Sequence, residues 1–191
     1  ELVSSVVFLR PLGLRLVMDM CNLLRRNKKP YAIAVGHCDN SDVVRQTARL
    51  VRATVAAKNL DGSSVGVIGG SFKGMGDFLV DSKELKKTFG IKLLEADNHE
   101  LRTLLSSVSD SEVAAELAEN EQKFAKGEDI NEENYLYNIK ACLAVRKWIE
   151  KHNLDAFSVN FLKIRDKTID SMPFIEACKA MERGIGYAGE G

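Results

Sequence analysis

Side chains capable of acid–base or metal chemistry follow one of the apolar runs in this sequence. His37, Cys38 and Asp39 come directly after the run at residues 31–35. Imidazole and thiolate are both metal ligands, so these three residues are candidates for a metal site. Adjacent residues on an extended chain point apart, however, and no second His or Cys follows three or four positions later. We therefore expect His37 to form a hydrogen bond at the end of its strand instead.

A glycine-rich segment at residues 69–77 (GGSFKGMGD) follows another apolar run. Glycines let the backbone approach a ligand closely and can direct amide groups at a phosphate. The segment does not match the GxGxxG pattern before a clear helix, and it lacks the Lys-Ser/Thr pair of a P-loop. We interpret it as a loop that lines a crevice rather than as a nucleotide site.

Other polar and aromatic residues give weaker signals. Asn160 and Phe161 close the apolar run at residues 156–159, and Phe161 can either wall a pocket or belong to the core. The glutamates between residues 112 and 128 form a charge run, which predicts a solvated helix face. No Ser-His-Asp arrangement and no paired-carboxylate spacing stands out, so the residues alone do not assemble a catalytic set.

The elements that must position these residues alternate along the chain. Buried strands are predicted at residues 31–35 and 65–68, and further strands at residues 91–94, 156–159 and 185–188. Helices are predicted at residues 12–26, 41–58, 82–89, 98–105, 109–126, 131–152 and 172–183. Such alternation specifies a parallel sheet covered on both faces. We therefore expect an α/β fold, a Rossmann-like three-layer domain with a mainly parallel sheet flanked by helices.

Local signals refine two of these helices. Ser109-Asp-Ser-Glu112 resembles a capping box, and Asn40 or Ser41 is the expected cap of the helix at residues 41–58. That helix has four apolar residues on one face: Val44, Ala48, Val51 and Val55.

In sheets of this kind, ligands bind beyond the carboxyl ends of the strands. This rule selects five segments as candidate ligand-binding positions: residues 36–40, 69–77, 95–98, 160–163 and 189–191. It narrows the search without naming a reaction.

Composition excludes several classes of protein. With 45% hydrophobic and 28% charged positions, the 191-residue chain is too apolar to be disordered. Its 27 Lys and Arg balance its 27 Asp and Glu, so it lacks the net positive charge of a nucleic-acid binder. No apolar stretch reaches the roughly 20 residues that a membrane helix needs. The four cysteines form no CxxC pair, which predicts reduced thiols and a cytoplasmic location. We expect one domain over residues 1–191, cut from a longer chain.

The C-terminal part of the sequence resembles a known family. Residues 156–161 (AFSVNF), the Met172-Pro173 pair and residues 181–191 (MERGIGYAGEG) are similar to the L-arabinose isomerase and L-fucose isomerase family. Its members have a strand that ends in Phe-Thr-x-x-Phe, a helix led by Leu-Pro, and a Gly-Tyr-Gly-Phe-Ala-Gly-Glu-Gly-Asp run. The resemblance is to the central domain on the arabinose-isomerase-like side of the family, with weaker similarity back to about residue 30.

The resemblance implies a metal-dependent aldose–ketose isomerase that acts on a pentose or deoxyhexose, such as L-arabinose or L-fucose, through an enediol. By residue-for-residue match, Glu190 is implied to be a metal ligand and the catalytic acid–base group, and Phe72 and Phe161 are implied to line the sugar pocket. The implied cofactor is Mn2+ or another divalent cation. The other metal ligands would follow Gly191, so the isolated chain is expected to be inactive and metal-free. The implied partners are a sugar and, in the longer parent protein, further copies of the same chain; no nucleic acid or membrane partner is expected.

Two departures from the family pattern leave the sugar open. Phe72 stands where arabinose isomerases place a pocket Met, and the spacer between Phe161 and Glu190 is slightly longer than is typical. The alternative hypothesis is a non-catalytic sugar- or nucleotide-binding α/β module whose terminal Gly-Glu-Gly is only a turn. A parent that keeps the fold but has lost activity is a third reading.

Overall fold

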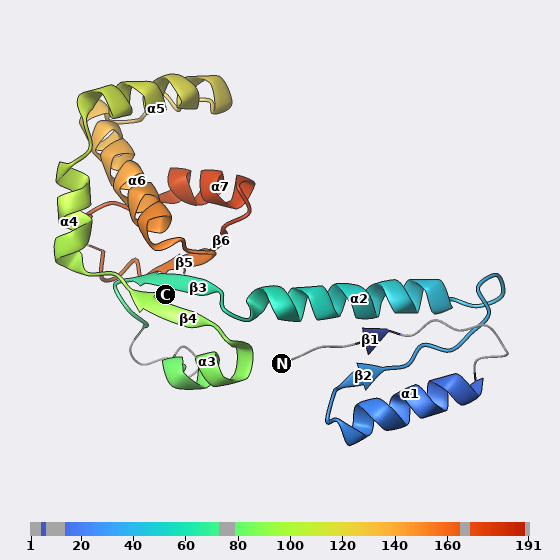
Figure 1. The fold of residues 1–191 in the computed structure, drawn as a ribbon. Helices are drawn as coiled ribbons and strands as arrows, with labels where there is room; N and C mark the ends of the chain where they lie inside the picture. The colour runs from blue at the N-terminus through green and yellow to red at the C-terminus, as the bar shows by residue number, and fades with distance from the viewer. Residues whose placement is uncertain (1–4, 7–13, 73–78, 165–168, 190–191) are drawn as a thin grey trace. The chain divides into compact units, whose positions relative to one another are not determined.

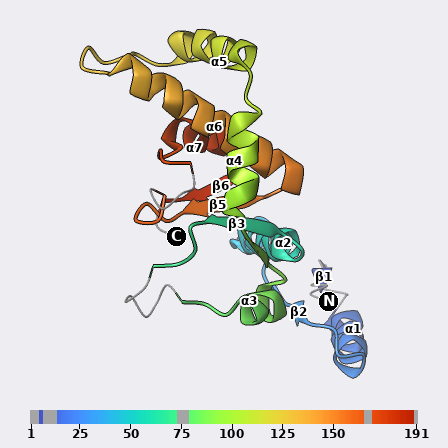
Figure 2. The ribbon, with the colours of Figure 1, turned by 90° about the vertical axis from the view of Figure 1, so that its left-hand side faces the viewer.

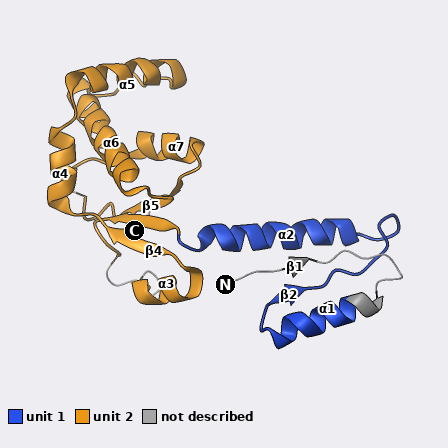
Figure 3. Cartoon of the chain, viewed as in Figure 1, with its two compact units in different colours: residues 1–62 blue, residues 63–191 orange. Residues whose placement is uncertain are grey.

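The chain divides into two compact units, residues 1–62 and residues 63–191 (Figure 3). The structure is a computed structural model that describes residues 5–6, 14–72, 79–164 and 169–189. Each unit is described by itself, and the expectation of one domain over residues 1–191 stays a prediction.

The first unit contains two short strands and two helices. In chain order these are β1 (Ser5–Val6), α1 (Leu14–Arg26), β2 (Tyr31–Ala32) and α2 (Val43–Leu60). The two strands pair in parallel, with Ser5 opposite Tyr31. Arg25 and Arg26 occupy the last turn of α1, where positive charge interacts favourably with the helix dipole.

The prediction of a buried strand at residues 31–35 is wrong in its extent. Only Tyr31 and Ala32 form strand, and Ile33 and Val35 are 56% and 79% exposed. Within the described part of the chain, β2 pairs with β1 alone, so the apolar residues after Ala32 have no neighbouring strand to pack beside.

The helix predicted at residues 41–58 is confirmed as α2, but it packs through a different face. Val44, Val51 and Val55 are exposed, whereas Val43 is buried and Leu50 half-buried. Val43 and Leu50 are seven residues apart, so they lie on the same side of the helix. The face that carries Val44, Ala48, Val51 and Val55 is therefore exposed in the described structure of this unit.

The second unit is built on a parallel sheet. Its elements are β3 (Ser64–Ile68), α3 (Ser82–Phe89), β4 (Lys92–Glu95), α4 (Asn98–Ser106), α5 (Asp110–Lys123), α6 (Glu132–His152), β5 (Ala156–Val159), α7 (Phe174–Glu182) and β6 (Gly186–Ala188). The strand order is β4-β3-β5-β6, and every neighbouring pair is parallel.

Helices lie on both sides of this sheet, which confirms the predicted three-layer α/β fold. Helices α4, α6 and α7 lie on one side and α3 on the other, as both views show (Figures 1 and 2). The core between α6 and the sheet includes Trp148, Phe157 and Ile68, all at most 1% exposed. Gly66 on β3 makes this packing possible, because a Cβ there would lie 2.3 Å from Cη2 of Trp148.

The helix caps agree with the sequence in one case and differ in another. The capping box at the start of α5 is confirmed, with the Ser109 backbone N donating to Glu112 at 2.8 Å. Hydrogen bonds from Lys147 and from Ser109 lower the pKa of Glu112 to about 2. The N-cap of α2 is Asp42, not Asn40 or Ser41.

Among the described residues, none of the helices combines the length and the apolar character needed to cross a bilayer.

Candidate functional site

The carboxyl ends of the strands in the second unit bring two predicted site residues together. Phe72 follows β3 and Phe161 follows β5, and their ring centroids are 5.1 Å apart at an interplanar angle of 59°. Phe72 is 8% exposed, whereas Phe161 is 47% exposed. Phe161 is therefore not an ordinary core residue. The pair presents one open aromatic side chain at the edge where ligands bind in folds of this class.

Asn160 holds the two loops of this edge together. It is 2% exposed, its Nδ2 donates to the carbonyl oxygen of Gly70 at 3.0 Å, and its Oδ1 accepts from the Leu162 backbone N at 3.1 Å. Gly69 and Gly70 both have positive φ, 84° and 69°, which glycine adopts without strain. This buried link fixes the loop of Phe72 against the loop of Phe161. Sequence reasoning placed Asn160 at the edge but missed the link, since no local pattern signals a partner 90 residues away.

The remaining residues of the predicted loop, 73–78, lie outside the described residues. The interpretation of the segment at residues 69–77 as a loop that lines a crevice stays a prediction.

Glu95 adds a carboxylate to the same edge. It is the last residue of β4 and is exposed. A Cβ built on Gly70 would lie 3.1 Å from Oε1 of Glu95, so this carboxylate lies directly against the Gly70 backbone.

Two hydroxyl groups near the ends of β5 and β6 are buried without a hydrogen-bond partner among the described residues: those of Ser158 and Tyr187. The Tyr187 ring packs on Phe157 with centroids 4.9 Å apart, and burial raises the pKa of Tyr187. A Cβ on Gly189 would lie 3.4 Å from the Tyr187 hydroxyl oxygen. This hydroxyl therefore lies beside the residue that precedes Glu190.

A buried ion-pair network anchors α7, the helix that leads into β6. Arg146 on α6 donates to both Glu116 oxygens at 2.7 and 2.8 Å and to Glu176 at 2.8 Å. Lys179 on α7 donates to Glu116 at 2.6 Å, and Glu176 also pairs with Arg183. Glu116, Glu176 and Lys179 are each at most 3% exposed. The network thus joins α5, α6 and α7 through ion pairs in which these three charges are almost fully buried.

The expectation of a solvated glutamate face at residues 112–128 is wrong for Glu116. Burial by itself would raise the pKa of Glu116, but the hydrogen bonds from Arg146 and Lys179 outweigh it, and the pKa is lowered. Those partners come from helices 30 and 63 residues further along the chain, so a pattern within α5 cannot reveal them.

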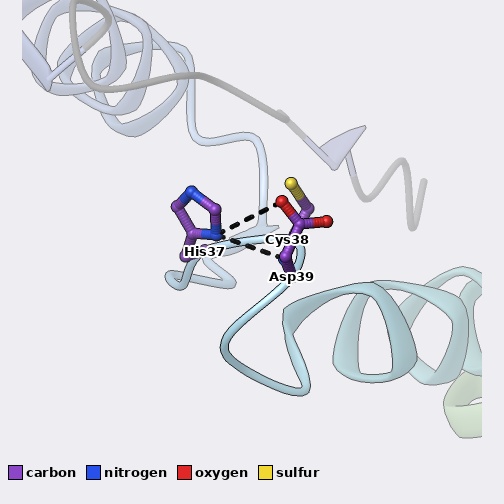
Figure 4. A group of neighbouring side chains, drawn as sticks. All are labelled: His37, Cys38 and Asp39. Atoms are coloured by element: carbon purple, nitrogen blue, oxygen red, sulfur yellow. Dashed lines mark hydrogen bonds and ion pairs between the residues drawn. The ribbon is translucent and has the colours of Figure 1, made fainter.

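His37, Cys38 and Asp39 lie closer together than predicted (Figure 4). Their potential ligand atoms are all within 4.8 Å of one another, so the expectation that adjacent side chains point apart is wrong here. His37 does form a hydrogen bond, in which its Nδ1 accepts from the Asp39 backbone N at 3.2 Å, but it lies five residues beyond the end of β2 and not at the strand end as predicted. All three residues are exposed and belong to the first unit.

The described residues do not by themselves fit a Mn2+ site at the sheet edge of the second unit. Among the described residues, three potential ligands cluster only at residues 37–39, and no such group lies at the sheet edge, where β4 is followed by the carboxylates of Glu95 and Asp97. Glu190, the predicted metal ligand and acid–base group, lies outside the described residues.

Comparison with known proteins places the second unit in context. A family model described as "L-arabinose isomerase central domain" matches residues 80–191. The L-arabinose isomerase of Pediococcus pentosaceus is 24% identical over 173 residues, which cover 88% of this chain and 35% of that protein. The L-arabinose isomerases of Mannheimia succiniciproducens and an Arthrobacter species are 20% and 23% identical, over 88% and 85% of this chain. The chain spans about a third of the length of these curated relatives.

Proposed function

Because the chain belongs to the L-arabinose isomerase central-domain family, we propose that it forms the central part of a metal-dependent aldose–ketose isomerase. The proposed substrate is a pentose or deoxyhexose, such as L-arabinose or L-fucose. The observation that carries the proposal is the contact between Phe72 and Phe161, residues from separate loops that meet at the carboxyl edge of the sheet. Sugar sites combine such apolar walls with a few placed polar groups.

The proposed reaction moves one proton between neighbouring carbons. A carboxylate takes the proton from C2 of the open-chain aldose and returns it to C1, while the hydroxyl proton on O2 passes to O1 through the enediol. Glu190, two residues beyond the end of β6, is the proposed carboxylate. Along the chain it follows α7 and β6.

The proposed cofactor is Mn2+ or another divalent cation, which stabilises negative charge on O1 and O2 when bound. The described residues do not complete such a site, so Glu190 would share the metal with residues from other parts of the parent. The isolated chain is accordingly proposed to be inactive. The parent is proposed to be a cytoplasmic homo-oligomer, consistent with the free cysteines of the described residues.

The test is to assay the parent with Mn2+ against a panel of aldoses and to measure ketose formation. Turnover of a pentose or deoxyhexose supports the proposal. Sugar binding without turnover of any aldose would contradict it and favour the non-catalytic sugar-binding module.

A further inference from the structure

Three side chains of the first unit place nitrogen, sulfur and oxygen donor atoms close together. They belong to His37, Cys38 and Asp39, in the connection between β2 and α2, and their potential ligand atoms are all within 4.8 Å of one another. The imidazole faces the Asp39 carboxylate, with Nδ1 and Oδ2 3.8 Å apart (Figure 4). In a tetrahedral zinc site, ligand atoms about 2.0–2.3 Å from the metal lie about 3.4–3.6 Å from each other. The spacing between His37 and Asp39 is therefore already close to the one that a metal ion requires.

The turn that carries these side chains is held by hydrogen bonds. The carbonyl oxygen of His37 accepts from the backbone N of Ser41 at 3.0 Å and from the Ser41 hydroxyl group at 2.7 Å. The Ser41 hydroxyl oxygen in turn accepts from the backbone N of Val43, a buried residue at the start of α2, at 3.3 Å. A Cβ on Gly36 would lie 2.2 Å from this hydroxyl oxygen, so the turn closes because residue 36 is glycine. The backbone around the three side chains is thus ordered without an ion, which lowers the entropic cost of binding one.

The donor atoms of this cluster are available to an ion. Nδ1 of His37 accepts a hydrogen bond from the Asp39 backbone N at 3.2 Å, so this nitrogen carries a lone pair, as a metal ligand must. All three side chains are exposed, so an ion reaches them from solvent and a fourth coordination position faces water. Asp42, the next acidic residue, is instead engaged by Arg45 at 3.3 Å and by Gln46 at 2.7 Å.

The donor set selects the class of ion. Thiolate and imidazole are ligands of Zn2+ and related transition metals, whereas Mn2+, Mg2+ and Ca2+ prefer oxygen donors. One thiolate and one carboxylate carry two negative charges, which balance the charge of a divalent ion. Zn2+ binds Cys, His and Asp side chains, and water takes the fourth position where a protein supplies three ligands. The cluster therefore suits Zn2+ better than the Mn2+ proposed for the isomerase.

We propose that His37, Cys38 and Asp39 form a binding site for Zn2+ or a related transition-metal ion, with water in the fourth position. On binding, the thiol of Cys38 releases its proton to solvent, and the three side chains replace water molecules of the hydrated ion. The site uses residues of the first unit alone. It does not depend on the proposed isomerase function, and it takes no part in the proton transfer.

The test is a titration of the unchanged chain with Co2+, a spectroscopic substitute for Zn2+, followed by the charge-transfer absorption band of the cobalt–thiolate bond. The band should saturate at one Co2+ per chain. Cys38→Ser should abolish it, and Cys178→Ser, a change of another exposed cysteine, is the matched control and should keep it. Removing either of the other ligands, in His37→Gln or Asp39→Asn, should weaken Co2+ binding at least about 10-fold. His99→Gln, a change of another exposed histidine, should leave it unchanged.

Alkylation tests the site with Zn2+ itself. Saturating Zn2+ should protect Cys38 from iodoacetamide, because a metal-bound thiolate is not free to react, and should leave the reaction of Cys178 unchanged, as mass spectrometry of the labelled peptides can show. Mn2+ at the same concentration should protect neither cysteine.

Several results would overturn the metal site. They are a cobalt band that persists in C38S or disappears in C178S, and Co2+ binding in H37Q and D39N that equals that of the unchanged chain. Saturation at one Co2+ per two chains would contradict the three-ligand site, because the metal would then bridge two copies. Failure of Zn2+ to protect Cys38, or equal protection by Mn2+, would contradict the assigned class of ion.

Discussion

Replacing Glu116 with Gln should strongly destabilise the protein. The change keeps the shape of a side chain that is 3% exposed but removes the charge that faces Arg146 at 2.7 Å and Lys179 at 2.6 Å. Breaking a buried ion pair costs about 3–5 kcal/mol, because the remaining charge stays desolvated. Arg146 keeps Glu176 and Lys179 keeps Glu119 as second partners, so we expect the lower end, about 3 kcal/mol.

Urea unfolding at neutral pH measures this loss in the free energy of unfolding directly. In thermal unfolding, Tm should decrease by about 6–12 °C for a chain of this size. Glu119→Gln is the matched control: it also faces Lys179, but Glu119 is 43% exposed, and exposed pairs contribute at most about 1 kcal/mol. The pKa of Glu116 is lower in the folded than in the unfolded protein. Its ionised carboxylate therefore stabilises the fold at pH values above the unfolded-state pKa, and this stabilisation is lost as the pH falls. The difference in the free energy of unfolding between E116Q and the unchanged protein should therefore become smaller below about pH 4. If E116Q loses no more unfolding free energy than E119Q, the interpretation of a buried ion-pair network is refuted.

Three further predictions concern the rest of the chain. Gly66→Ala should cost about 1–3 kcal/mol in urea unfolding through overpacking, and Gly127→Ala, whose Cβ would meet nothing closer than 4.0 Å, should not; equal costs would contradict the packing. Cys142, whose pKa burial raises to about 12, should resist iodoacetamide at pH 8 while exposed Cys178 reacts, as mass spectrometry can show; equal labelling would argue against the burial. Glu112 has a pKa of about 2, so stability should fall between about pH 4 and pH 2, and E112Q should flatten that decline; parallel curves would disprove the assignment.

The parts of the fold that local interactions decide were predictable. The strand at residues 156–159 has the predicted bounds, and the helix at residues 82–89 coincides with α3. The capping box that begins at Ser109 depends on residues within one turn, and the sequence contains all of them. The parallel sheet also followed from the alternation of strands and helices.

What the sequence could not reveal depends on distant partners. The exposure of Val35 follows from the absence of a neighbouring strand in the described part of the chain, and the burial of Glu116 follows from cations on two other helices. The edge rule selected the segments of Phe72 and Phe161, but the ring contact and the Asn160 link that supports it needed the three-dimensional arrangement. Glu95 lay in a selected segment without any pattern that marked it.

The most direct test of the proposed isomerase is the Glu190→Gln variant of the parent, assayed with Mn2+ for ketose formation from the best aldose of the panel. Loss of the acid–base group should lower turnover at least about 100-fold. Metal affinity is measured in parallel by calorimetry, since Glu190 is also the proposed ligand. Retained isomerase activity in E190Q, with unchanged metal affinity, would contradict the central claim.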